Sequence, residues 1–172
     1  MPPDNPPNNN PEQIRALEAI VRALQDMAPN FGSFIGCRVT RSSNQSIANN
    51  TGTSIDWGSS EDFDTSGMHD PSSDTTRITI QEDGVYAVGY NFAFTTTANG
   101  DRRKGYILIN NATVLAAQEG DKQNTTSPQF STTEPYEFVA GDYIELQVFQ
   151  DSGGSLNCTG AAMWAYKIGE IA

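Results

Sequence analysis

Large apolar residues alternate with small or polar ones along residues 84–94, GVYAVGYNFAF. A period of two over such a stretch is typical of a β-strand with one face in a hydrophobic core. The large positions are Tyr86, Val88, Tyr90, Phe92 and Phe94, and the small or polar positions are Ala87, Gly89, Asn91 and Ala93. The face of the strand that carries the small or polar residues is open to close approach by another surface. The pattern predicts the central strand of an antiparallel sandwich, entered through a turn at residues 82–84.

Short alternating runs separated by Gly, Asn, Asp, Ser and Thr clusters continue from residue 35 onward, and no helical period appears there. This arrangement is typical of a β-sandwich. The predicted strands span residues 35–41, 53–57, 76–81, 84–94, 105–110, 113–118, 130–139, 143–150 and 160–168. Tight turns are expected at Asn110-Asn111 and Gly141-Asp142. We therefore predict an all-β antiparallel domain over residues 35–169.

One helix is predicted before this domain, over residues 11–28. Asn10 suits the N-cap, Pro11 the first helical position and Gln13 the capping box, and Pro29 ends the helix. Its apolar residues fall at positions a and d of two heptads: Ile14, Leu17, Val21, Leu24 and Ala28. The helix either docks on its own domain or self-associates as a short stalk. We favour the stalk, although two heptads do not fix the oligomer number.

Residues 1–10 consist of Pro and Asn with one charged residue and one Met, too little apolar surface to fold alone. We expect an extended arm that is ordered only when a partner holds it. The N-terminus also lacks the basic and apolar regions of a secretory signal, so synthesis in a cytoplasm without export is expected.

The net charge of −11, with a sequence pI near 4.3, argues against a nucleic-acid partner, because phosphate binding requires a basic face. It also disfavours anionic membranes, and no apolar run is long enough for membrane insertion.

Several motifs together resemble the trimeric jelly-roll heads shared by the complement first-component q subunit and the tumour necrosis factor family. They occur in the family's order over residues 36–169: FD at 63–64, ITI at 78–80, GVY at 84–86, ILINN at 107–111, FVAGDYIEL at 138–146 and an apolar last strand around Trp164. The phrase FDTSGMHDP at 63–71 also resembles bacteriophage versions of this head, found on tail and capsid appendages. The resemblance implies a ten-strand-type jelly roll and a homotrimer. A helical stalk in place of a collagen repeat fits the virion versions.

In such heads the inner sheet faces a threefold axis, which implies which residues meet other subunits. The implied trimer-interface residues are Ile14, Leu17, Val21 and Leu24 on the helix, Ala87, Gly89 and Asn91 on the central strand, and Met163 and Ala165 on the last strand. Trp164, Tyr166 and Ile168 would then lie in the core.

The same topology places the loops at residues 95–104, 119–129 and 151–158 at a tip far from the stalk, and the two tight turns at the base. Arg102-Arg103-Lys104 is the one basic cluster of the chain. The candidates for receptor contact are Arg102, Arg103, Lys104, Asn124 and Asp151. The alternative is that the basic cluster pairs with acidic residues of a neighbouring subunit.

Catalysis is not expected, because no nucleophile, base and polarising group are brought together by a known motif. The single histidine, His69, is interpreted as a solvated or capping residue in a polar loop.

Acidic residues crowd the loop that contains His69. Asp62, Asp64 and Asp70 are weak calcium candidates, but their spacing does not match an EF-hand. We expect no cofactor, with calcium as the alternative. Cys37 and Cys158 are expected near opposite ends of adjacent strands, too far apart for a disulfide.

These observations favour a non-enzymatic phage virion protein: a homotrimeric surface appendage whose head attaches to a host receptor or glycan, as a tail fibre or receptor-binding tip. Residues 1–28 would bind another virion protein. The first alternative is a capsid decoration protein or head fibre held by the N-terminal arm. The second is a secreted ligand or carbohydrate-binding module outside viruses.

Overall fold

The computed structural model describes residues 11–27, 34–97, 100, 102–121 and 127–171. Its backbone divides into two compact units, Met1–Ser33 and Phe34–Ala172, here called the stalk unit and the head. Each unit is considered by itself. The predicted arm at residues 1–10, the N-cap Asn10 and Ala28 lie outside the described residues.

The stalk unit contains the helix α1, Pro11–Met27, close to the predicted bounds. Pro11 opens it and Glu12 lies in its first turn, where a carboxylate suits the positive end of the helix dipole. The apolar stripe is exposed along the helix, with 44% exposure at Ile14, 61% at Leu17, 57% at Ile20 and 47% at Val21. No helix among the described residues is both long and apolar enough to cross a bilayer.

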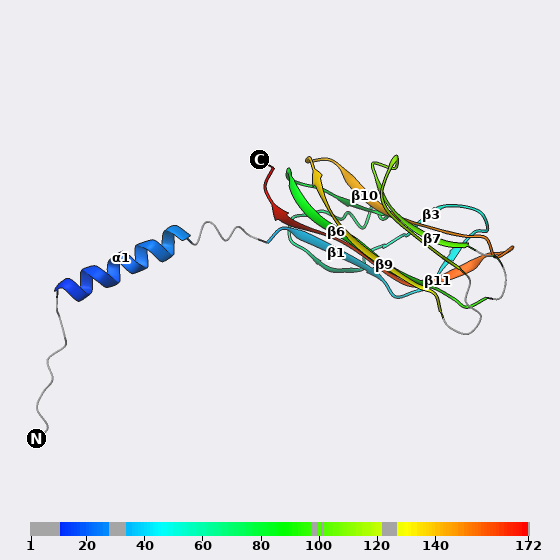
Figure 1. Ribbon diagram of the computed structural model, residues 1–172, viewed down its shortest axis with the longest axis horizontal. Coiled ribbons are helices and arrows are strands. Elements are labelled where there is room, and N and C mark those ends of the chain that lie inside the picture. The colour runs from blue at the N-terminus through cyan, green and yellow to red at the C-terminus, as the bar shows by residue number, and fades with distance from the viewer. Residues whose placement is uncertain (1–10, 28–33, 98–99, 101, 122–126, 172) are drawn as a thin grey trace, which may run out of the picture. The chain divides into compact units, whose positions relative to one another are not determined.

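The head is a sandwich of two antiparallel sheets (Figure 1). The six-stranded sheet has the order β4 (Glu61–Asp64), β1 (Gly36–Arg41), β11 (Leu156–Gly169), β6 (Gly84–Phe94) and β9 (Gln129–Phe138), with β2 (Gln45–Ile47) paired to β11. The five-stranded sheet has the order β3 (Thr53–Ser54), β10 (Tyr143–Gln150), β7 (Arg102–Ile109) and β8 (Thr113–Asp121), with β5 (Arg77–Thr79) paired to β10. This is the predicted jelly-roll arrangement.

The core lies between the two sheets, and β6 supplies its largest side chains. Tyr86, Val88, Tyr90, Phe92 and Phe94 are buried, as the alternation predicts. The ring of Phe92 stacks on that of Phe130 from β9, with centroids 4.9 Å apart. The hydroxyl of Tyr90 donates a hydrogen bond to the carbonyl of Gly105 on the facing sheet, at 3.1 Å. The central strand therefore joins both layers.

The predicted faces of the last strand are wrong. Met163 and Ala165 are fully buried in the core, whereas Ile168 is 60% exposed and Trp164 and Tyr166 are partly exposed. Strand pairing explains the inversion, because Met163 pairs with Tyr90 and Ala165 with Val88, and paired residues share a face of the sheet. The larger side chains of β11 thus point away from the sandwich.

Two strands were not predicted, and two others, β7 and β11, begin several residues earlier than predicted, at Arg102 and Leu156. The predicted strands include neither the short edge strand β4, which contains Phe63 and Asp64, nor β2. Both lack a long apolar alternation, so the sequence signal is weak. Strand β7 begins at Arg102, so the basic cluster lies in a strand and not in a loop.

Cys37 and Cys158 are both buried, and neither forms a disulfide. Cys37 lies opposite Ala165 and Cys158 opposite Phe94, toward different ends of β11, which confirms the predicted separation. Burial raises the pKa of both thiols, so neither is activated as a nucleophile.

His69 is buried and not solvated. Its Nδ1 lies 2.8 Å from the carbonyl oxygen of Arg77, and its Nε2 lies 2.9 Å from that of Gly58. Its backbone N–H donates to the carboxylate of Asp64 at 2.9 Å. The side chain therefore ties its own segment between β4 and β5 to the β3–β4 connection and to the first residue of β5, which gives it a structural role.

Candidate functional site

The side of the six-stranded sheet that faces away from the core, here the outer face, is the first candidate surface. Ala87, Gly89 and Asn91 of β6 lie on it, as predicted, because the alternate residues of that strand are in the core. Gly89 pairs with Trp164 of β11, and a Cβ at Gly89 would come within 2.5 Å of both Trp164 Cζ2 and the carbonyl oxygen of Thr132. The glycine therefore leaves the space that the indole ring of Trp164 occupies.

Aromatic side chains cluster on the outer face at its base end. Phe34, Phe63 and Tyr166 form a triangle in which each pair of ring centroids is 5.8 Å apart. Phe34 is 55% exposed. Burial raises the pKa of Tyr166. An aromatic cluster that is still partly exposed is a feature of protein interfaces.

A hollow of about 680 Å³ lies on the outer face nearer the tip. Small or uncharged residues line much of it, including Thr40, Asn91, Ala93, Ser131 and Gly160. Arg38, which also lines it, forms an ion pair with Asp62. The outer face thus carries a partly exposed aromatic cluster and a hollow.

The structure separates the predicted interface residues into three groups. Ala87, Gly89 and Asn91 are on the outer face, Met163 and Ala165 are in the core, and the helix residues Ile14, Leu17 and Val21 are exposed on α1. The side chain of Leu24 lies outside the described part of the chain. Trp164, Tyr166, Phe34 and Phe63 were not predicted on this face. The pairing register of β11 with β6 would have identified the first two.

The second candidate surface is the tip, where several loops meet at the end of the head away from the N-terminus of β1 (Figure 1). Backbone hydrogen bonds join them: Thr95 N–H to Asn157 at 2.9 Å, Asn50 N–H to Gln150 at 2.8 Å and Phe94 N–H to Pro128 at 3.1 Å. At the other end, the two predicted base turns touch through Asn110 Nδ2 and Asp142 Oδ1, at 2.8 Å. The predicted sorting of loops is confirmed for these described segments.

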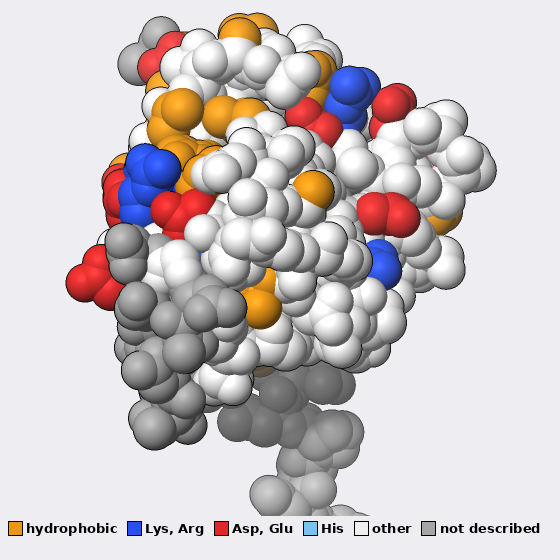
Figure 2. All heavy atoms as spheres, turned by 90° about the vertical axis from the view of Figure 1, so that its right-hand side faces the viewer, with side chains coloured by type: hydrophobic (Ala, Val, Ile, Leu, Met, Phe, Trp, Pro, Cys, Tyr) orange, Lys and Arg blue, Asp and Glu red, His pale blue; other side chains and the backbone are white. Residues whose placement is uncertain are grey.

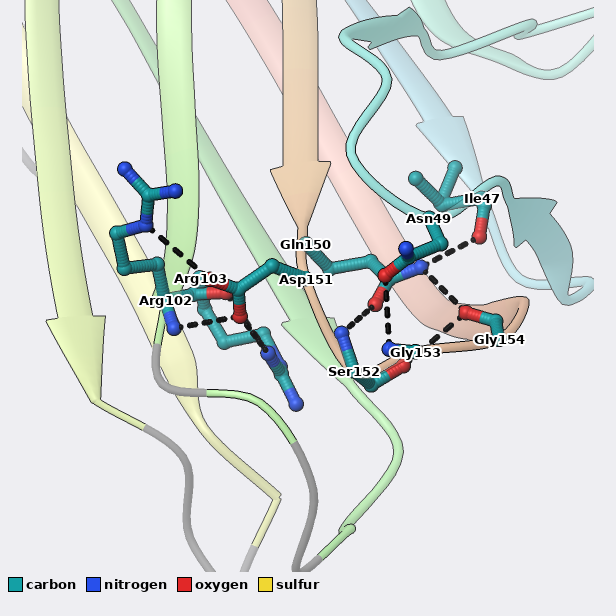
Figure 3. Close-up of polar contacts among 9 residues, drawn as sticks. All are labelled: Ile47, Asn49, Arg102, Arg103, Gln150, Asp151, Ser152, Gly153 and Gly154. Carbon is teal, nitrogen blue, oxygen red and sulfur yellow. Dashed lines mark hydrogen bonds and ion pairs between the residues drawn. The ribbon is translucent and has the colours of Figure 1, made fainter.

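Asp151 organises one side of the tip (Figure 3). Its carboxylate accepts the backbone N–H of Arg102 at 2.9 Å and Arg102 Nε at 3.1 Å, and lies 3.5 Å from Arg103 Nη1. Arg103 is only 1% exposed, and its guanidinium lies 6.0 Å from the ring centroid of Phe94. Desolvation lowers the pKa of Arg103, and Asp151 opposes that shift. The pair is thus a structural element of the tip.

Within the head, the three residues of the basic cluster are paired with acidic residues of the same chain, and only Arg103 is too buried to meet a receptor. Arg103 is buried, Arg102 is held by Asp151, and Lys104 forms a 2.6 Å ion pair with Glu119 of the neighbouring strand. The alternative of pairing with another subunit is not needed for these charges, because acidic residues of the same chain neutralise them. Asn124 lies outside the described residues.

Gln150 fixes the other side of the tip (Figure 3). It is fully buried, and its Nε2 donates to the carbonyls of Ile47 at 3.0 Å and Gly154 at 2.8 Å. Its Oε1 accepts the N–H of Ser152 at 2.7 Å. Asn49 Oδ1 accepts the N–H of Gly153 at 2.8 Å. Sequence analysis missed these two amides, because amide residues in polar loops carry no distinctive pattern.

The surface of the tip is mostly uncharged. Figure 2 looks onto this end of the head, and most of the visible surface consists of backbone and uncharged polar side chains. Residues 42–52 and 152–166 contain no charged side chain. In a chain with a net charge of −11, the acidic surplus is therefore concentrated elsewhere.

The calcium candidates do not converge. Asp62 pairs with Arg38, Asp64 accepts the N–H groups of Ser66 and His69, and Asp70 accepts hydrogen bonds from Ser72 and Ser73. The Ser72 and Ser73 hydroxyls hold the pKa of Asp70 well below its usual range. Within the described ranges, no group of three or more His, Cys, Asp or Glu side chains is arranged to hold a metal ion.

Solved structures share this fold at low sequence identity. Eiger TNF from S. frugiperda superposes with a TM-score of 0.61 at 12% identity, covering 81% of this chain and 95% of that chain. The globular domain of zebrafish complement 1qA superposes with a TM-score of 0.58 at 14% identity, covering 80% and 99%. No protein-family model and no curated protein matches the sequence. The head is thus a jelly roll of the kind seen in TNF and complement 1q domains.

Proposed function

We propose that the protein is a non-enzymatic, homotrimeric surface appendage of a bacteriophage particle, with a jelly-roll head that attaches to the host surface. The observation that carries the proposal is the outer face of the six-stranded sheet. Its aromatic residues Phe34, Phe63 and Tyr166 remain partly exposed in the single chain, although they pack on one another. Association through this face removes that apolar surface from water in every subunit.

The helix α1 supports the same assembly. Ile20 widens the exposed stripe beyond the a and d positions occupied by Ile14, Leu17 and Val21. In a three-stranded bundle each helix contacts two neighbours, so a wider stripe is covered than in a two-stranded coil. A helix of 17 residues is marginal in water by itself, so a trimeric head would hold the three helices together.

Attachment would work by avidity. The hydrogen bonds of Gln150 and Asn49 and the ion pairs of Asp151 order the tip before it meets a partner, which lowers the entropic cost of binding. Three equivalent tips on one trimer, and many trimers on one particle, would convert weak contacts into firm adhesion.

The virion setting is supported by the phrase FDTSGMHDP and by the helix in place of a collagen stalk. Residues 1–28 would anchor the trimer on another virion protein, and the chain would be made in the host cytoplasm before assembly. A density map of the particle that places this segment against a tail protein supports a receptor-binding tip. Placement across capsomers would favour the decoration alternative.

Adsorption of phage to host cells in the presence of the purified protein tests the attachment role. The proposal predicts that saturating amounts of the protein occupy the receptor and reduce adsorption severalfold. A head carrying Trp164→Glu and Tyr166→Glu on the outer face should block less well, because it loses the avidity of the trimer. Undiminished adsorption at every concentration of the wild-type protein would refute attachment.

A further inference from the structure

His69, the one histidine of the chain, is buried with both ring nitrogens against oxygen atoms that can only accept a hydrogen bond. Nδ1 lies 2.8 Å from the carbonyl oxygen of Arg77, the first residue of β5, and Nε2 lies 2.9 Å from that of Gly58, which precedes β4. A neutral imidazole carries a single N–H, so one of these contacts would set a nitrogen lone pair against a carbonyl oxygen. We infer that His69 is an imidazolium cation that donates from both nitrogens, and that its proton makes the attachment of the edge strand β4 sensitive to pH.

The charges on the surrounding segments suit a buried cation. Residues 56–77 contain six carboxylates, and the one basic residue among them besides His69 is Arg77, which pairs with carboxylates of its own. A hydrogen bond from Thr75, together with the charges of Arg41 and His69, lowers the pKa of Asp56. Burying a charge costs free energy unless the charge is hydrogen-bonded and compensated, and the two carbonyls and the acidic segment do both. The charged groups on the segments that pack around the ring are Arg41 of β1, Asp56 after β3, Asp64 of β4, Asp70 and Arg77.

The histidine segment is connected to the outer face through β4. Among the described strands β4 pairs with β1 alone, because it ends the six-stranded sheet, and that pairing is interrupted by a register shift. Asp64, the last residue of β4, accepts the backbone N–H of His69 at 2.9 Å. Phe63 of the same strand belongs to the aromatic cluster with Phe34 and Tyr166. The position of Phe63 on the outer face therefore depends on the segment that the His69 ring holds in place.

Loss of the second ring proton weakens this attachment. A histidine in an unfolded chain gives up its proton near pH ~6.5, whereas the folded head holds it through two hydrogen bonds that the unfolded chain lacks. Above that pH folding therefore takes up a proton, so the contribution of His69 to stability is fully present below about pH 6.5 and is lost as the pH rises and the folded head releases the proton. A bare ring nitrogen would then face a carbonyl oxygen in a buried site, and the segment would have to move to relieve the contact. Since β4 carries part of the outer face, the self-association proposed above, on which this step rests, should weaken with it.

Nuclear magnetic resonance of the full-length protein labelled with ¹⁵N in histidine tests the protonation state, because the chain has a single histidine. At about pH 7.5, above the range in which an unfolded histidine is protonated, both ring nitrogens of the native protein should still show an attached hydrogen. The same protein unfolded in urea at that pH should show the signals of a neutral ring. One bare ring nitrogen in the native protein at that pH would overturn the inference. The measurement uses the wild-type protein, so it does not depend on the folding of a variant.

Hydrogen exchange, corrected for the intrinsic rate at each pH, tests the link to the edge strand. The amide of Thr65, directly after β4, donates to the carbonyl of Gly36 at 3.0 Å, and its protection should fall severalfold between about pH 6 and pH 8. His69→Gln, which can donate but does not titrate, should remove this pH dependence. The amide of Thr95 at the tip, bonded to Asn157 at 2.9 Å, is the internal control and should not respond. Protection of Thr65 that is constant in the wild type, or that falls equally in the His69→Gln protein, would overturn the inference.

Sedimentation velocity at the same two pH values separates this inference from the proposed function. Wild-type trimers should dissociate at a severalfold higher concentration near pH ~8 than near pH ~6, and His69→Gln trimers should not show the difference. Equal dissociation of the wild type at both pH values would overturn the link between the histidine and assembly. A single-chain mass at both pH values would instead refute the proposed self-association, while the ¹⁵N result would still decide the state of His69.

Discussion

Gly89 is the residue at which the packing of the outer face is most constrained. A Cβ there would lie within 2.5 Å of the backbone carbonyl of Thr132 and of the indole of Trp164. Gly89→Ala should therefore destabilise the head by about 1–3 kcal/mol, because a backbone oxygen cannot move aside as a flexible side chain does. Urea unfolding measures this change. Gly154→Ala, where a Cβ meets no atom within 4 Å, is the control and should change stability by less than about 0.5 kcal/mol. Equal effects at both positions would contradict the packing described here.

Tyr90 links stability to alkaline pH. Burial raises its pKa to about 12, whereas an unfolded tyrosine ionises near pH ~10. The unfolded state therefore loses this proton first, and the contribution of Tyr90 is present below about pH 10 and is lost between about pH 10 and 12.

Tyr90→Phe should cost about 1 kcal/mol at neutral pH, because the hydrogen bond to Gly105 is lost. It should also reduce the fall in unfolding free energy across that alkaline window. Urea unfolding at neutral pH and at several alkaline pH values measures both effects. An identical alkaline decline in the two proteins would show that Tyr90 is not responsible.

At the scale of elements, the sequence predicts strand existence better than strand faces. The alternation along residues 84–94 identifies both the bounds and the core face of β6, because only one register buries five large side chains. On β11, Trp164 and Tyr166 are larger than Met163 and Ala165, so size suggests the opposite of the observed face. The pairing of Met163 with Tyr90 decides it, and such a contact between distant segments is not written in either strand alone.

For the candidate sites, too, periodicity predicted the features that lie within one element, and contacts between distant segments could not be predicted. The exposed stripe of α1 and the outward face of β6 were predictable from periodicity. The ion pairs of the basic cluster could not be predicted, because its partners, Asp151 and Glu119, approach only when β7 pairs with β10 and β8. A charge run in sequence does not say which of its members the fold neutralises.

The tip loops depend on Asp151. Asp151→Asn removes the charge that faces Arg102 and the buried Arg103, so it should destabilise the head by about 2–4 kcal/mol and speed exchange of the Arg102 amide hydrogen. Hydrogen exchange resolved by residue is the measurement. Glu134→Gln, an exposed carboxylate on β9, should change neither quantity. Unchanged protection at Arg102 in the Asp151→Asn protein would contradict the role given to this carboxylate.

The stripe of α1 is expected to strengthen the trimer. Leu17→Glu combined with Val21→Glu should raise the concentration at which trimers dissociate about tenfold or more, because apolar contacts are replaced by like charges. Sedimentation velocity over a dilution series detects this shift. Ala19→Glu, outside the a and d positions, is the matched control and should leave dissociation unchanged. If all three substitutions are without effect, the helix does not take part in self-association.

At the scale of the whole molecule, the fold and its surfaces point to one arrangement. In the proposed arrangement the six-stranded sheet of the jelly roll would face other copies of the chain, and the largely uncharged tip would face an outside partner (Figures 1 and 2). The outer face would bring the subunits together and the tip would make the external contacts, so each surface has a separate role. Self-association through the outer face is the condition on which avidity depends.

The mass of the purified full-length protein, measured by sedimentation equilibrium over a range of concentrations, tests that condition directly. The account predicts a species of three times the 18.6 kDa of one chain. A single-chain mass at every concentration, with Trp164 and Tyr166 left in contact with water, would contradict it.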